Sequence, residues 1–103
     1  GEQALTSEIT AISTPGHTPG SMSLAIVSGG ERALIIGDVT TNPAQVSEPD
    51  WEFAFDMDPK LAVQSRKQMI DRAEADNAYL IACHYHSFGR VVRLEGRRYW
   101  QGI

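Results

Sequence analysis

Three side chains that could bind a metal ion stand at the ends of apolar segments. His17 lies at the centre of "STPGHTPGS" (residues 13–21), Asp38 follows the apolar run "ALIIG", and His84 follows "YLIAC". The prolines and glycines around His17 would fix the direction of its imidazole, and Gly37 would let a backbone or ligand approach Asp38. Imidazole nitrogens and carboxylate oxygens are donors that a divalent metal such as zinc takes. These three residues are therefore candidate metal ligands.

Each candidate also has an ordinary structural interpretation. His17 could be a turn residue that hydrogen-bonds its own backbone, and Asp38 could cap nearby N–H groups at the start of a loop. His84 or His86 could be a core or surface histidine. The metal hypothesis rests on the combination, because all three candidates stand where an apolar segment meets a polar one.

The segments that carry these residues are predicted strands. Apolar runs around Gly29-Gly30 predict a hairpin over residues 22–38, because this dipeptide supplies the positive φ of a tight turn. Reflected about the turn, Asp38 falls opposite Ser21, and the chain need only fold back after His17 for its imidazole to approach the same end. Further strands are predicted over residues 8–13 and 78–84, and a second hairpin over 89–101 turns at Glu95-Gly96.

One amphipathic helix is predicted over residues 58–77. Asp58 can cap its N terminus, and Pro59 stands at the first helical position, where its missing N–H costs nothing. The preceding residues, 39–58, show no sustained period and contain two prolines, which predicts a long irregular excursion. The apolar side of the helix consists of Leu61, Ala62, Ser65, Met69, Ile70 and Ala73, whereas Lys60, Arg66, Lys67, Asp71 and Glu74 fall mostly elsewhere.

This order of elements predicts an α+β fold, with a mainly antiparallel sheet covered on one face by a single helix. The 103 residues suffice for one domain, 1–103. No apolar run approaches the ~20 residues that span a bilayer, so no membrane association is expected. A signal peptide is expected to be absent or already removed, and the start at Gly1 fits a tag remnant, a cleaved product or a piece of a longer protein.

The charge balance argues against a nucleic-acid partner. The formal net charge is −4, with nine basic against thirteen acidic residues. Tyr99 and Trp100 could stack on bases beside a group of arginines, but a solvated hairpin face is the favoured interpretation. The arginines of this group are Arg90, Arg93, Arg97 and Arg98.

The single cysteine, Cys83, excludes an internal disulfide and suits a reducing compartment, so a cytoplasmic protein is expected.

Four motifs together resemble the C-terminal half of metallo-β-lactamase-fold hydrolases, closest to their lactonase and organophosphate-hydrolase-like branch. They are "TPGHTPG", then "ALIIGDV" about twenty residues on, then "FDMDP" opening a helix, then "YLIACHYHSFGRV". The resemblance runs from Ile9 to Trp100. It implies half of a four-layer αββα sandwich, and a site at which His17 binds one zinc ion, Asp38 bridges two and His84 completes the second. The parent reaction would be hydrolysis of an ester, lactone, amide or phosphoester by a metal-activated water, with no protein nucleophile.

The same resemblance implies a substrate side for the loop 39–58. Trp51, Phe53 and Phe55 would line it, although their alternation equally fits a short strand that buries one face. Family members often carry a second histidine where this chain has Ser21, and that residue is usually not a ligand.

The family's first metal motif, His-x-His-x-Asp-His, does not occur in this sequence. Each metal would keep one histidine and a share of Asp38, whereas catalytic zinc normally takes three protein ligands. The chain is therefore expected to be a truncated half that is inactive or nearly so alone. One apolar sheet face would be left bare, and a second copy in a two-fold homodimer is the expected cover.

Two alternatives remain open at this point. The chain could be a self-associating binding or scaffold module that reuses the half-fold without metal. It could also be a homodimeric enzyme that pools the ligands of two copies, which ranks last because the two sites would have to face each other.

Overall fold

Seven strands form one sheet, and their order in space follows their order in the chain. The computed structural model describes residues 1–103. All neighbouring strands are antiparallel except β4 and β5, which are parallel. The predicted α+β fold with a mainly antiparallel sheet is therefore confirmed. The strands are β1 (Glu2–Ala4), β2 (Ile9–Ser13), β3 (Met22–Ser28), β4 (Glu31–Gly37), β5 (Tyr79–Ala82), β6 (Gly89–Leu94) and β7 (Arg97–Gly102).

Two helices follow β4, where one was predicted. The long helix α2 (Pro59–Asp76) begins as expected: the Asp58 side chain accepts the backbone N–H of Leu61, and Pro59 is the first helical residue. It ends at Asn77, whose φ of 49° is left-handed and stops the helix. The short helix α1 (Ala44–Ser47) lies inside the segment predicted to be irregular. Neither helix has the length and apolar character needed to span a membrane.

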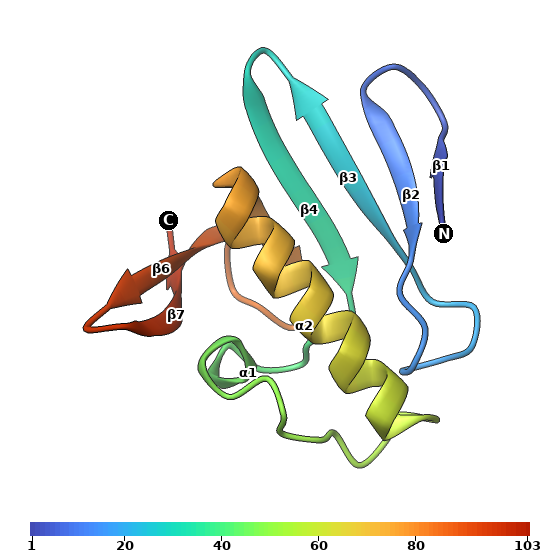
Figure 1. The fold of residues 1–103 in the computed structure, drawn as a ribbon, viewed down its shortest axis with the longest axis vertical. Coiled ribbons are helices and arrows are strands. Elements are labelled where there is room, and N and C mark those ends of the chain that lie inside the picture. The colour runs from blue at the N-terminus through green and yellow to red at the C-terminus, as the bar shows by residue number, and fades with distance from the viewer.

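Helix α2 crosses one face of the sheet as it carries the chain from β4 to β5 (Figure 1). Between them lies a core to which the sheet contributes Leu34, Ile36 and Leu80 and the helix contributes Met69 and Ile70, all fully buried. A helical crossover is the usual connection between parallel neighbours. The crossover leaves the C-terminal ends of β4 and β5 side by side at one edge of the core.

The opposite face of the sheet carries a second apolar surface without a helix on it. Side chains alternate along a strand, so residues next to the buried ones point the other way. Leu24, Ile26, Ile35 and Ile81 do so, and the register pairs Leu24 with Ile35 and Ile35 with Ile81. All four are half-buried within the single chain. We call them the open face.

Ion pairs attach the β6–β7 hairpin to the helices. Arg93 donates to both carboxylate oxygens of Glu74, at 2.5 and 3.0 Å, and Arg98 donates to Asp71 at 2.6 Å. The hydrogen bonds from Arg93 lower the pKa of Glu74 below its usual value. Two of the four arginines that raised the question of nucleic acid, Arg93 and Arg98, thus face carboxylates of α2.

Candidate metal centre

The loop that carries His17 is fixed against the start of α2. Gly16 has a φ of +138°, and a Cβ added to it would lie 2.2 Å from the backbone nitrogen of Ala62, so only glycine allows this approach. The backbone N–H of Asp58 donates to the carbonyl of Gly16 at 2.8 Å, and that of Met57 donates to the carbonyl of His17 at 3.1 Å. The loop therefore places His17 at a defined point beside the helix.

Asp38 and His84 follow the neighbouring parallel strands β4 and β5. The backbone N–H of Cys83 donates to the carbonyl of Gly37 at 3.1 Å, which holds the two chain ends together. Gly37 has a φ of 53°, at a shift in the β4–β5 register, and an added Cβ would meet nothing within 4 Å. No other protein segment therefore occupies the space beside Gly37. The glycine supplies a positive φ that turns Asp38 out of the strand.

The structure brings His17, Asp38 and His84 together. The Nε2 atom of His17 lies 3.5 Å from Oδ2 of Asp38, and the Nε2 atom of His84 lies 3.0 Å from Oδ1. Oδ1 is buried and has no partner with hydrogen-bond geometry, although His84 is close. Each oxygen of one carboxylate thus faces one imidazole. His86, by contrast, is exposed.

A buried aspartate, Asp56, contacts the other side of the His17 ring. Its Oδ1 lies 2.9 Å from Nδ1 of His17, and its side chain is 1% exposed. Sequence reasoning missed Asp56, yet a signal was present: "FDMDP" contains two aspartates and the helix cap needs only Asp58. A second acidic residue with no local role is a candidate for a contact elsewhere.

Arg66 lies behind Asp56 and is fully buried, so its predicted place on the polar side of α2 is wrong. Its guanidinium donates to three carbonyls, and Nη2 lies 3.7 Å from Oδ2 of Asp56. Burial lowers the pKa of Arg66, and the charge of Asp56 acts in the opposite direction. The interior accepts this arginine because loop carbonyls satisfy its donors. They belong to Val39 at 3.0 Å, Pro49 at 2.9 Å and Trp51 at 2.7 Å.

A buried tyrosine joins the segment after Asp38 to the segment after His84. The hydroxyl of Thr40 donates to Oη of Tyr85 at 2.5 Å, and Oη donates to the carbonyl of Asn42 at 3.2 Å. Burial raises the pKa of Tyr85. These contacts link residues more than forty positions apart, and the sequence carried no local sign of them.

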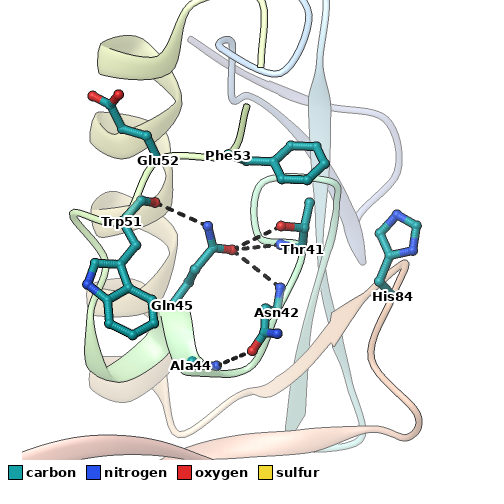
Figure 2. A pocket seen from close by; sticks show the side chains of 8 residues that line it. All are labelled: Thr41, Asn42, Ala44, Gln45, Trp51, Glu52, Phe53 and His84. Atoms are coloured by element: carbon teal, nitrogen blue, oxygen red, sulfur yellow. Dashed lines mark hydrogen bonds between the residues drawn. The ribbon is translucent and has the colours of Figure 1, made fainter. Parts of the chain in front are cut away.

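A pocket of about 480 Å³ opens beside His84 (Figure 2). In it the Gln45 amide accepts the backbone N–H groups of Thr41 and Asn42 and donates to the carbonyl of Trp51, so the loop around the pocket is internally bonded. The lining residues are Thr41, Asn42, Ala44, Gln45, Trp51, Glu52, Phe53 and His84.

Two of the three aromatic residues predicted to face a substrate line this pocket. They are Trp51 and Phe53, and the Phe53 ring centroid also lies 6.2 Å from that of His17. Phe55 does not line the pocket and is 79% exposed. Its ring meets that of Phe53 edge-on, with the two ring centroids 5.3 Å apart. Residues 51–55 form no strand, which removes the alternative interpretation of their alternation.

The donors fit part of a zinc site. When Nδ1 of His17 donates to Asp56, its Nε2 presents a lone pair to a carboxylate oxygen of Asp38. Two acceptors then face each other, and a cation between them would be favourable. Each side of Asp38, however, offers one imidazole and one oxygen, fewer than the three ligands of catalytic zinc. Nowhere in the structure do three or more His, Cys, Asp or Glu side chains come together as the ligands of one metal ion.

Comparisons with known proteins found a matching family and similar solved structures. The family model of the metallo-beta-lactamase superfamily matches residues 3–84, a range that contains His17, Asp38 and His84. The comparison with curated proteins gives no significant match.

Three solved structures show how much of a whole protein the chain represents. AidC, a dizinc quorum-quenching lactonase in complex with a homoserine product, is 26% identical with a TM-score of 0.85; the match covers 98% of this chain and 35% of AidC. The hydrolase AbOPH is 27% identical with a TM-score of 0.85, covering 95% and 35%. A probable metal-dependent hydrolase from Staphylococcus aureus, at 20% identity and a TM-score of 0.76, shares the fold over 96% and 36%. The chain thus spans about a third of these proteins.

Proposed function

The chain belongs to the metallo-beta-lactamase superfamily, and from this premise we propose that it is the C-terminal half of a zinc-dependent hydrolase. Nearly the whole chain aligns with about a third of a dizinc lactonase and of a hydrolase. The match over nearly the whole chain, together with its single sheet, supports the proposal that the present residues make up one αβ half of a sandwich. The other half would supply the remaining sheet and ligands.

The observation that carries the proposal is the position of Asp38 between two imidazoles. His17 and Asp38 would hold one zinc ion, and His84 and Asp38 would hold the other, so Asp38 would serve both. When bound, zinc supplies Lewis-acid polarisation of a carbonyl or phosphoryl group and activates water for hydrolysis. The parent substrate class is accordingly an ester, lactone, amide or phosphoester.

The loop beside the site would bind the substrate. Its pocket of about 480 Å³ is in the range of small-molecule sites. Trp51 and Phe53 would provide its apolar wall, with Phe55 supporting Phe53 from outside. The amide of Gln45 holds this wall in place through the carbonyl of Trp51.

The chain alone would be inactive or nearly so, because it supplies two donors to each zinc ion. The ligands it lacks are those of the His-x-His-x-Asp-His motif, absent from this sequence. Residual zinc affinity would remain, weaker than that of a complete site by the loss of the other donors.

Zinc titration of the purified chain, followed calorimetrically, tests the proposal. We expect weak uptake that Asp38→Ala abolishes. Asp50→Ala is the matched control, since Asp50 is exposed, pairs with Lys67 and lies outside the site. A wild-type chain that takes up no zinc, or an Asp38→Ala chain that binds zinc as the wild type does, contradicts the assignment.

The open face favours a second candidate, a self-associating binding or scaffold module that holds no metal. A second copy would cover Leu24, Ile26, Ile35 and Ile81, which no helix covers within the single chain, in a two-fold homodimer. Native mass spectrometry with and without zinc separates the candidates. A dimer that never takes up zinc favours the module, whereas zinc uptake that depends on Asp38 favours the hydrolase half. A monomer at every concentration contradicts the homodimer.

A further inference from the structure

We infer that Asp56 is a positioning residue that holds the His17 imidazole with its proton on Nδ1 and its Nε2 lone pair directed at Asp38. The inference deepens the proposed function and rests on it for the role of His17 as a ligand. The orientation of the ring can nevertheless be tested without metal.

The first support is that His17 is the sole hydrogen-bond partner of the Asp56 side chain. Oδ1 contacts Nδ1 of His17 at 2.9 Å, and Oδ2 is buried with no hydrogen bond. A carboxylate that is 1% exposed has lost the water that would otherwise stabilise its charge, so this burial is costly. The contact that offsets the cost ends on a candidate metal ligand, and a carboxylate accepts but cannot donate.

A purely structural role, in which Asp56 only neutralises the buried charge of Arg66, fits the geometry poorly. An arginine placed to pair with a carboxylate normally presents two parallel N–H donors to it. Arg66 instead directs its donors to three loop carbonyls and comes no nearer to Asp56 than 3.7 Å. Arg66 therefore holds the loops and balances the charge, while the hydrogen bond of Asp56 acts on His17.

The backbone gives Asp56 and His17 a fixed separation. The next residue after Asp56, Met57, donates its N–H to the carbonyl of His17 at 3.1 Å, and the N–H of Asp56 itself donates to Phe53 at 3.1 Å. Backbone hydrogen bonds thus fix the segments that carry Asp56 and His17, independently of the contact between the two side chains. Because Asp56 holds the ring at Nδ1, the ring cannot turn its Nε2 away from Asp38. An outer carboxylate orients a histidine ligand in this way.

Long-range ¹H–¹⁵N NMR of the metal-free chain in alkaline buffer reads the protonated nitrogen of each histidine. We expect wild-type His17 to carry its proton on Nδ1. Asp56→Ala should move it largely to Nε2, the form that a free imidazole prefers, while Asp56→Asn should restore Nδ1–H because its amide oxygen still accepts. Asp58→Asn is the matched control: its side chain caps α2 two residues away and should leave His17 unchanged.

The outcomes separate the inference from the proposed function. A wild-type His17 protonated on Nε2, or an Asp56→Ala chain that keeps Nδ1–H, overturns the inference, and the first result needs no variant to fold. A second readout is zinc titration, in which Asp56→Ala should weaken uptake about 10- to 100-fold while Asp58→Asn does not. A chain with the expected proton position but no zinc uptake contradicts the proposed function and leaves the positioning of His17 supported.

Discussion

Replacing Arg66 with methionine tests whether one buried guanidinium holds the loops of the site together. Methionine keeps an unbranched apolar stem that reaches about as far as Nε of the arginine, so the packing of that stem against the sheet is largely preserved. The hydrogen bonds from the guanidinium to the three loop carbonyls are lost, together with the positive charge beside Asp56.

The size of the effect follows from what is left unpaired. The carbonyl of Trp51 keeps the Gln45 amide as a donor, but those of Val39 and Pro49 lose the donor that Arg66 provided. Removing one partner of a buried charge pair costs about 3–5 kcal/mol, mainly because the other charge stays buried. We therefore expect Arg66→Met to lower the free energy of unfolding by about 3–5 kcal/mol, a large share of the stability of a small domain.

Urea denaturation at fixed protein concentration, followed by tryptophan fluorescence, measures the change. Arg66→Lys should lie between the wild type and Arg66→Met, because it keeps the charge but loses the planar set of donors. Arg72→Met on the same helix is the matched control: Arg72 pairs with Glu2 and Asp76 at the surface, and its loss should cost within about 0.5 kcal/mol. A loss below about 1 kcal/mol for Arg66→Met refutes the argument.

Three further substitutions or conditions test separate contacts. Gly16→Ala should destabilise the fold by about 1–3 kcal/mol in the same assay, because its Cβ would meet the α2 backbone at 2.2 Å, whereas Gly20→Ala, with open space, should not; equal effects contradict this account of the loop. Hydrogen bonds from Arg93 lower the pKa of Glu74 in the folded protein. The stability that they contribute is therefore present above the unfolded pKa of 4.5 and is lost as the pH falls through the folded pKa. Glu74→Gln should flatten that part of the stability–pH curve, and an unchanged slope argues against the ion pair. Tyr85→Phe should cost about 1–3 kcal/mol through the buried groups it leaves unpaired, and a neutral result would show that the hydroxyl does not join the two segments.

The elements with strong local signals could be predicted from the sequence. The Gly29-Gly30 turn and the Asp58-Pro59 helix start depend on residues next to each other, so the β3–β4 hairpin and α2 were found near their true bounds. The strand β1 has three exposed residues and pairs only with β2, and α1 has four residues. Such short elements exist because of their tertiary neighbours, so no local pattern marks them.

The candidate ligands were found in the sequence, whereas the residues that hold them in place were not. His17, Asp38 and His84 stand at the ends of apolar segments, and that placement can be read along the chain. Asp56 reaches His17 across 39 positions, and Arg66 finds its carbonyls up to 27 positions away. Helical periodicity assigns an arginine to the solvent side by default, so its burial depended on backbone acceptors that only the folded loops provide.

Anomalous diffraction at the zinc edge, from crystals of the chain grown with zinc, tests the central claim most directly. The account predicts zinc density between His17 Nε2 and Oδ2 of Asp38 and between His84 Nε2 and Oδ1 of Asp38, with the carboxylate shared. Zinc bound instead at His86, Cys83 or surface carboxylates, with none in contact with Asp38, would contradict it.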